Sequence, residues 1–207
     1  TVGVNIGANK DSADRVHDYE LGVERFATFA SYLTVNISSP NTPGLRDMQT
    51  RASLAELLFR IVTVRDGTVQ KVGRKVPIFL KIAPDLHEDD LADIAAEVLD
   101  NRIEGVIVSN TTISRPHLTY EAANQAGGIS GSPLFERSTT ALAKMRKLLG
   151  PQVALIGVGG VDGVDTALEK IRAGSYLVQL YTAMIYAGPT LPGRIVKGFS
   201  KYLDREG

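Results

Sequence analysis

The sequence contains no cysteine among its 207 residues. This absence excludes disulfide bonds, thiolate metal ligands and a cysteine nucleophile. The chain also lacks net charge, because 23 basic residues balance 23 acidic ones, and so it has no electrostatic preference for nucleic acid or anionic membranes. No apolar run approaches the roughly 18 residues of a membrane-spanning helix. What remains is a globular composition, 43% hydrophobic and 22% charged, that suits one domain over residues 1–207.

Six short runs rich in β-branched residues are expected to form strands. They cover residues 2–6, 32–37, 76–82, 105–109, 153–158 and 175–180. The runs are continuously apolar, which is typical of strands buried on both faces of a parallel sheet. Helical spacing of apolar residues separates them at 14–30, 51–64, 88–99, 138–149 and 164–173. This alternation predicts an α/β fold with right-handed crossovers.

Two architectures accommodate six βα units: an open doubly wound sheet and an incomplete barrel. Polar residues or glycines end every predicted strand, namely Asn5, Asn36, Lys81, Asn110, Gly159-Gly160 and Tyr181-Thr182. A barrel gathers all its strand ends around one mouth, whereas an open sheet offers mainly one crevice. We therefore predict a (β/α)8 TIM barrel, incomplete in this chain, with about six of eight βα units present and the first two upstream of Thr1.

The stretch from Asn36 to Leu45 follows a predicted strand and is polar, with two prolines and a glycine that end regular structure. On its own, it is equally typical of a binding surface and of an ordinary polar loop. The second predicted polar strand end, Ser109-Asn110-Thr111-Thr112, has the same chemistry. Two such sites in one predicted mouth favour a binding surface.

Lys81 ends a predicted buried strand. A lysine in such a place needs an anion or oxygen acceptors, so a functional role is favoured over a structural ion pair. We expect Asp85, four residues later, only to cap the next helix. A long loop follows from 113 to about 134 and contains the glycine-rich stretch 127–133, typical of a binding loop. His117 in this loop is expected to be exposed rather than a ligand or base.

Glycines Gly157, Gly159 and Gly160 run from a predicted strand into a helix. Backbone N–H groups in such a turn can surround an anion. Barrels commonly bind phosphate after strands seven and eight. With two strands upstream, these glycines follow strand seven, and Tyr181-Thr182 follows strand eight. The sequence therefore predicts a phosphate-bearing cofactor, and it offers no metal site, because no His/Asp/Glu cluster lies near the strand ends.

Several segments together resemble the dihydroorotate dehydrogenases. They are Asn36-Ile37-Ser38-Ser39-Pro40-Asn41-Thr42, Lys81-Ile82-Ala83-Pro84-Asp85, Asn110-Thr111-Thr112, Gly127-Gly128-Ile129-Ser130-Gly131, Ile156-Gly157-Val158-Gly159-Gly160 and Leu177-Val178-Gln179-Leu180-Tyr181-Thr182. Ser39 occupies the place of the catalytic base, where class 1 enzymes have cysteine, so the resemblance is to class 2, the membrane-associated, quinone-using branch. Segments 114–116 and 168–174 resemble animal mitochondrial members, which implies a location at the mitochondrial inner membrane.

The resemblance implies oxidation of dihydroorotate to orotate in pyrimidine synthesis, with FMN as first electron acceptor and ubiquinone as second. Ser39 is implied to remove the C5 proton while the C6 hydride passes to flavin N5, and Thr42 to relay that proton through water. The implied substrate contacts are Asn36, Asn41, Asn110 and Thr111. The implied FMN contacts are Asn5, Asn36, Lys81, Ser109, Ser130, Gly131, Gly159, Gly160, Tyr181 and Thr182. Ser109 departs from the relatives' threonine but keeps the hydroxyl.

In this family the upstream part supplies two βα units, the helices of the quinone tunnel and the membrane contact. We therefore expect ubiquinone and a peripheral membrane site to depend on that absent segment, and residues 1–207 alone neither to retain FMN nor to turn over. One alternative is another FMN-dependent barrel oxidoreductase acting on a dihydropyrimidine. Such enzymes usually have cysteine at the acid/base position, which the Ser39 loop lacks. A non-catalytic, barrel-derived binding protein is a second alternative.

Overall fold

The computed structural model describes residues 1–115 and 124–206, so His117 lies outside the described residues. Its centre is one sheet of six parallel strands in the order β1-β2-β3-β4-β5-β6. The strands are β1 (Gly3–Ile6), β2 (Tyr32–Asn36), β3 (Ile78–Ile82), β4 (Gly105–Val108), β5 (Ala154–Val158) and β6 (Leu177–Gln179). Each strand falls within one of the six predicted runs, so the parallel α/β prediction is confirmed.

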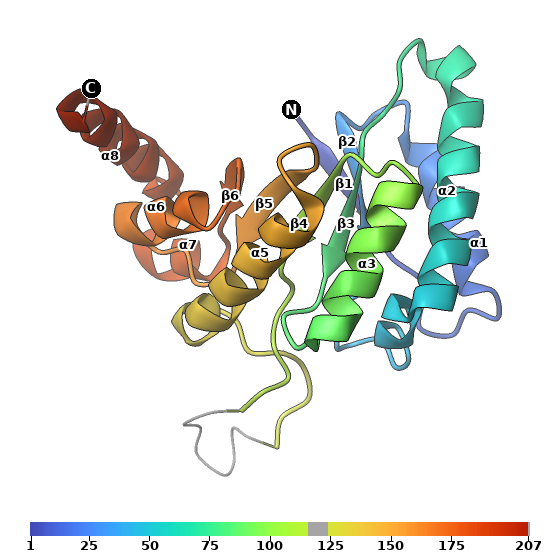
Figure 1. Cartoon of the computed structure of the whole chain (residues 1–207), viewed down its shortest axis with the longest axis horizontal. Helices are drawn as coiled ribbons and strands as arrows, with labels where there is room; N and C mark the ends of the chain where they lie inside the picture. The colour runs from blue at the N-terminus through green and yellow to red at the C-terminus, as the bar shows by residue number, and fades with distance from the viewer. Residues whose placement is uncertain (116–123, 207) are drawn as a thin grey trace.

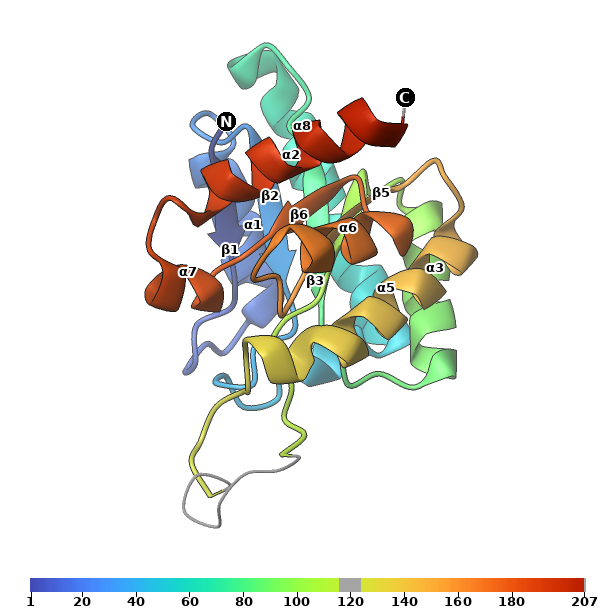
Figure 2. The same ribbon diagram turned by 90° about the vertical axis from the view of Figure 1, so that its left-hand side faces the viewer.

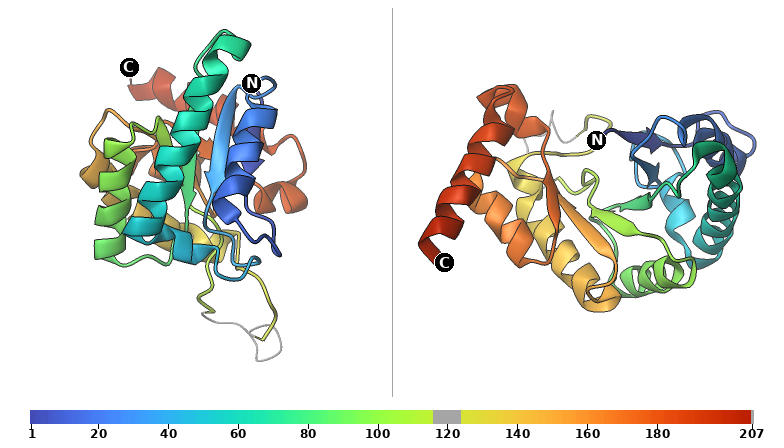
Figure 3. Two further views of the ribbon diagram at one scale, coloured as in Figure 1. Left: turned by 90° about the vertical axis from the view of Figure 1, so that its right-hand side faces the viewer. Right: turned by 90° about the horizontal axis from the view of Figure 1, so that it is seen from above.

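The sheet curves into an open arc with helices along its outer side (Figure 3). Adjacent strands in the chain are also adjacent in the sheet, as in a barrel, whereas a doubly wound sheet reverses its strand order. The sheet is therefore an incomplete (β/α)8 barrel, as predicted. Within the described residues β1 and β6 are its edges.

Helices separate the strands and cover the convex face of the arc (Figure 1). They are α1 (Arg15–Phe26), α2 (Arg51–Val72), α3 (Glu88–Asp100), α5 (Phe135–Leu149) and α6 (Val164–Arg172). One strand face supplies Leu33, Leu80 and Val106 to the main core, where they pack with helical side chains such as Leu57 and Ile94. Because successive strand residues point to opposite faces, the alternate positions face the concave side of the arc.

Helix α2 runs eight residues beyond its predicted end at 64, up to Val72, and stops at Gly73 with a left-handed φ of 74°. Its last turns bury Arg65 and Thr68 instead of aliphatic residues. The Arg65 guanidinium bonds Glu104 at 3.0 Å and Asp66 at 2.5 Å. The helical spacing of apolar residues therefore stops at residue 64, because the buried face of α2 beyond that point is filled by an ion pair and not by aliphatic side chains.

Two helices near the C-terminus were not predicted: α7 (Thr182–Ala187) and α8 (Leu191–Glu206). Helix α8 lies over α6 and packs through a second, small core that includes Ala167, Leu191 and Ile195 (Figure 2). Two 3-10 turns complete the described part, η1 (Arg46–Gln49) and η2 (Ser132–Leu134). Within that part, no helix has the length and hydropathy required to cross a membrane.

Candidate active site

The C-terminal strand ends place Asn36 and Lys81 next to each other on the concave side of the arc. The register pairs Asn36 of β2 with Lys81 of β3 and Lys81 with Ile107 of β4. Residues paired across parallel strands point to the same face of a sheet. The continuation of this row is apolar, with Ile156 beside Ile107. The Asn36 amide and the Lys81 cation are therefore neighbours in a row of concave-side residues, and the row becomes aliphatic on β4 and β5.

The side chains of Asn36, Ser38 and Asn110 form a cluster of neutral hydrogen-bonding groups. Asn36 Oδ1 accepts from Ser38 Oγ at 3.0 Å and from Asn110 Nδ2 at 3.2 Å. Ser38 is completely buried, and its hydroxyl also reaches the Lys81 carbonyl at 2.8 Å. The Tyr19 hydroxyl holds the Asn36 carbonyl at 2.7 Å, and its burial raises the Tyr19 pKa. Asn36 is therefore fixed through its oxygen, which leaves its Nδ2 group available to a ligand.

The loop after β2 carries the predicted base. Asn41 N–H donates to Ser39 Oγ at 3.2 Å, and the Ser39 hydroxyl itself donates to no residue in the described ranges. The glycines of the loop after β4 pack against this segment. A Cβ on Gly128 would lie 3.1 Å from Pro40 Cγ, and one on Gly127 would lie 3.4 Å from Asn41 Oδ1. The two loops therefore meet, and no direct bond joins Ser39 to the predicted relay Thr42.

An ion pair between Arg46 and Asp85 connects these loops. Arg46 donates to Asp85 Oδ2 at 2.9 Å, to the Ser38 carbonyl at 3.2 Å and to the Thr111 carbonyl at 3.0 Å. Asp85 also accepts from the Thr112 hydroxyl and, at 3.0 Å, from the Ile113 amide. The expectation that Asp85 only caps a helix is wrong, because α3 begins after His87. The carboxylate faces the loops of the mouth instead of the helix.

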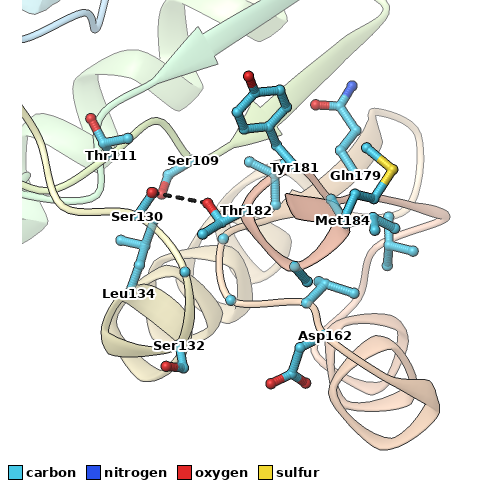
Figure 4. Close-up of a pocket in the computed structure, with 18 of the residues that line it drawn as sticks. Ser109, Thr111, Ser130, Ser132, Leu134, Asp162, Gln179, Tyr181, Thr182 and Met184 are labelled. Atoms are coloured by element: carbon cyan, nitrogen blue, oxygen red, sulfur yellow. Dashed lines mark hydrogen bonds between the residues drawn. The ribbon is translucent and has the colours of Figure 1, made fainter. Parts of the chain in front are cut away.

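One cavity of about 870 Å³ opens at the C-terminal ends of β3 to β6 (Figure 4). Ten predicted site residues line it: Lys81, Ser109, Asn110, Thr111, Ser130, Gly131, Gly159, Gly160, Tyr181 and Thr182. In Figure 4 the Thr182 hydroxyl bonds Ser130 Oγ, at 2.9 Å, on one wall, while Gln179 and Met184 lie on another. Nearly all the predicted cofactor residues therefore surround a single space.

Lys81 is the cationic side chain that lines this cavity. Its ammonium forms no hydrogen bond or ion pair with any residue in ranges 1–115 and 124–206, although the side chain is partly buried. Burial lowers the Lys81 pKa. A desolvated cation without a partner is costly unless an anion or oxygen acceptors receive it. The cavity is where such a partner fits.

Gly159 and Gly160 form a wall that no larger residue could build. Both have positive φ, 105° and 74°, and the ideal Cβ atoms would lie 2.8 Å from Ser138 Oγ and 2.5 Å from Phe135 Cβ respectively. The turn therefore needs glycine for conformation and for space. Such a turn exposes backbone N–H groups to the cavity, as an oxyanion requires.

Five predicted residues do not line the cavity. Asn36 borders it through its bond to Asn110, and Ser39, Asn41 and Thr42 belong to the adjoining loop. Asn5 pairs with Thr34, one row below Asn36, and is exposed. Among the described residues, no group of His, Cys, Asp or Glu is arranged to hold a metal.

The sequence reasoning missed several contributors to this mouth. Ser38, Arg46 and Gln179 were not predicted, although Gln179 lines the cavity. A polar side chain inside an otherwise apolar strand run was the available signal for Gln179. No local pattern pointed to Arg46, because its three partners come from different loops.

A family model described as dihydroorotate dehydrogenase matches residues 1–203.

The chain belongs to the dihydroorotate dehydrogenase family.

Curated relatives in this family carry the name "Dihydroorotate dehydrogenase (quinone)". The chain is 67% identical to that of Mesorhizobium japonicum and 61% identical to that of Rhizobium rhizogenes, each over 206 residues. A crystal structure described as DHODH in complex with ferulenol from Eimeria tenella shares 38% identity and superposes with a TM-score of 0.91. Each match covers 99% of this chain, but only 56%, 57% and 58% of the respective relatives. The chain thus spans little more than half their length.

The names of these relatives confirm the resemblance to class 2 that was inferred from Ser39. They do not support the animal mitochondrial type, or a mitochondrial location, because these dehydrogenase relatives are bacterial. Segments 114–116 and 168–174, on which that expectation rested, are too short to separate animal from bacterial members of one class.

Proposed function

We propose that this chain is the cofactor-binding part of a quinone-dependent dihydroorotate dehydrogenase, which oxidises dihydroorotate to orotate in pyrimidine biosynthesis. One observation carries the proposal. The unpaired ammonium of Lys81 and the clustered amides of Asn36 and Asn110 adjoin a cavity whose other wall is the Gly159-Gly160 turn. Neutral donors and acceptors suit a flat, amide-rich ring, and the glycine turn suits a phosphate.

The residues around the cavity fit FMN. Lys81 has no partner among the described residues, and the glycine turn has no room for a Cβ. Bound FMN would supply the hydride acceptor of the oxidation. Lys81 would stabilise the negative charge that develops on the ring. The proposed contacts to the phosphate and ribityl side are Ser130, Gly131, Gly159, Gly160, Tyr181 and Thr182. Asn5, Asn36 and Ser109 are further proposed contacts of the flavin.

Ser39 is the proposed base that removes the C5 proton of dihydroorotate. Its Oγ accepts the Asn41 N–H bond, and its own proton is uncommitted within the described residues. A serine hydroxyl is a weak base, so the proton needs an onward acceptor. Thr42, three residues along the same loop, is the proposed relay through water. Asn36, Asn41, Asn110 and Thr111 are the proposed contacts for the substrate carboxylate and ring amides.

The remaining parts of the enzyme are proposed to lie upstream of Thr1. Residues 1–207 would form six βα units of the barrel, and two further units would pair with the edges of β1 and β6. The upstream segment would also carry the quinone site and the peripheral contact with a membrane. The support is the share of the bacterial relatives that this chain covers, 56% and 57%.

The visible spectrum of the full-length protein tests the activity. We expect flavin absorbance as purified and its bleaching when dihydroorotate is added without oxygen. Dihydrouracil should leave the spectrum unchanged, because it lacks the carboxylate. Bleaching by dihydrouracil alone would instead assign the protein to another dihydropyrimidine oxidoreductase.

Replacement of Ser39 tests the proposed base. The Ser39→Ala variant should retain its flavin but lose roughly 10²–10⁴-fold of the reduction rate at neutral pH, the usual contribution of general base catalysis. Thr63→Ala, on the outer surface of α2, is the matched control and should behave as wild type. An unchanged rate in Ser39→Ala would remove this residue from the mechanism.

A further inference from the structure

Lys170 is a lysine on α6 whose side chain is completely buried, with 0% of its surface exposed. Its ammonium donates to Ser138 Oγ at 2.6 Å and lies 4.9 Å from the centre of the Phe135 ring. No carboxylate forms an ion pair with it in the part of the chain that the structure describes. Buried lysines are rare and are normally paired, so this cation lacks the compensation expected of a structural one.

A short chain of hydrogen bonds connects Lys170 to the glycine wall of the cavity. Ser138, also 0% exposed, bonds the Gly159 carbonyl at 3.1 Å through the hydroxyl that receives Lys170. The beginning of α5 is close to the same turn, since a Cβ on Gly160 would lie 3.0 Å from the Phe135 nitrogen. The cation is therefore directly behind the turn, on the side away from the cavity.

The glycine wall itself presents no cation to the cavity. Lys81 belongs to β3, two strands away from the turn that follows β5, and among the described lining residues the charged side chain next to that turn is Asp162. A phosphate at this wall would meet backbone N–H groups with a carboxylate nearby. Backbone dipoles solvate an oxyanion but carry no net charge to balance it. Among the described residues, the Lys170 ammonium therefore has no carboxylate partner on one side of the Gly159-Gly160 turn. On the other side of the turn, the cavity offers a phosphate at this wall no cation.

We propose that Lys170 is the counter-charge for the phosphate of the bound flavin nucleotide, acting through Ser138 and the Gly159-Gly160 turn. It is a positioning residue, because it reaches the cofactor only through these groups. The inference rests on the proposed function. Burial lowers the Lys170 pKa to about 7, against the opposing effect of Glu169. An anion across the wall would favour the charged form.

The test compares FMN with riboflavin, which has the same ring and no phosphate. Full-length FMN-free protein is titrated with each flavin, and binding is followed by the quenching of flavin fluorescence. Lys170→Met removes the charge and keeps an unbranched side chain that is only one atom shorter. We expect its FMN dissociation constant to rise roughly 10- to 30-fold, as for charges separated by two hydrogen bonds in a partly buried setting. Its riboflavin dissociation constant should stay within about twofold.

Two further variants separate this role from a structural one. Ser138→Ala interrupts the connection and should weaken FMN binding by a smaller factor, again without effect on riboflavin. Lys144→Met, at an exposed lysine of α5 that pairs with Glu88, should change neither constant. Thermal denaturation of FMN-free Lys170→Met should give a midpoint no lower than that of wild type, because an unpaired buried cation is lost.

Equal weakening of FMN and riboflavin binding in Lys170→Met, or unchanged binding of both, would overturn the inference. A lowered melting midpoint with a phosphate-independent loss would identify Lys170 as a structural residue. These results differ from failure of the proposed function, in which the wild-type protein itself binds neither flavin.

Discussion

The Arg46–Asp85 ion pair gives a prediction that separates loop positioning from cofactor binding. The two side chains are 20% and 13% exposed, and the guanidinium also bonds the carbonyls of Ser38 and Thr111. Asp85→Asn preserves the shape of the carboxylate and removes its charge. Arg46 then remains mostly buried without its anion, and its other two bonds hold the loops less firmly.

The magnitude follows from the contacts. Removing one partner of a fully buried pair costs about 3–5 kcal/mol, and a single hydrogen bond to a charged group contributes about 1.5–3 kcal/mol. Since water still reaches Arg46, and Asn can still accept one bond, we expect a loss of about 2–3 kcal/mol of unfolding free energy. In a chain of this size that corresponds to a fall of roughly 4–12 °C in Tm, and the fall is smaller in the longer full-length protein. The loop that carries Ser39 would also shift, and misplacement of a reacting group by about 1 Å can cost 10²-fold in rate.

The assay is dihydroorotate-dependent quinone reduction by the full-length protein, with flavin content measured by absorbance on the same sample. We expect kcat/KM to fall about 10- to 100-fold while flavin content stays within 20% or so of wild type. Asp93→Asn is the matched control, because Asp93 pairs with Arg51 on the surface, where the side chains are 43% and 58% exposed. Exposed pairs contribute about 0–1 kcal/mol, so neither Tm nor rate should change appreciably.

Two results would refute this reasoning. One is a kcat/KM for Asp85→Asn within about twofold of wild type, which would mean that the loops keep their position without the pair. The other is a loss of flavin parallel to the loss of rate, which would mean that the pair supports the cavity as a whole instead of the substrate loops.

Three further predictions concern other charged groups. Lys81→Met should lower retained FMN and slow flavin reduction by more than 10-fold, as judged by absorbance and stopped-flow, because charge on the ring loses its cation; undiminished reduction would contradict this role. Arg65→Met should lower the unfolding free energy by about 2–3 kcal/mol in urea and leave kcat unchanged, since Arg65 and Glu104 belong to the opposite end of the sheet from the mouth; an altered kcat would contradict this. Lys170 has a pKa of about 7 in the folded protein and 10.5 when unfolded, so the unfolded state binds more protons between these two pH values. The unfolding free energy of FMN-free protein should therefore rise from pH 7 to pH 9. An equal rise in Lys170→Met would show that another group is responsible.

Strand positions and strand ends were predictable because their signals are local. A run such as residues 105–109 is apolar until the chain emerges from the sheet, where Asn110 and Thr111 replace the aliphatic residues. Parallel topology then brings every such end to one edge, so Lys81, Asn110 and Gly159 had to lie near one another. The neighbourhood of the site followed from strand order alone.

The remaining features depend on partners distant in the sequence. Arg46 acquires its role from Asp85 and Thr111, 39 and 65 positions away, and Lys170 from Ser138, 32 positions away. The end of α2 was missed because Arg65 is buried by an ion pair with Glu104. An isolated arginine or lysine in a sequence resembles a solvated one, and only tertiary structure distinguishes them.

The strand order has a consequence for how the chain can be assembled. Within the described residues, each of the six strands hydrogen-bonds only to strands that precede or follow it directly in the sequence. Contacts between near neighbours are formed at a small cost in loop entropy, and chains rich in them fold comparatively fast. A nascent chain could therefore add one βα unit after another as it leaves the ribosome, each new strand templated by the last. On such a route the cavity would be completed late, because its glycine wall and Thr182 arrive with the final units.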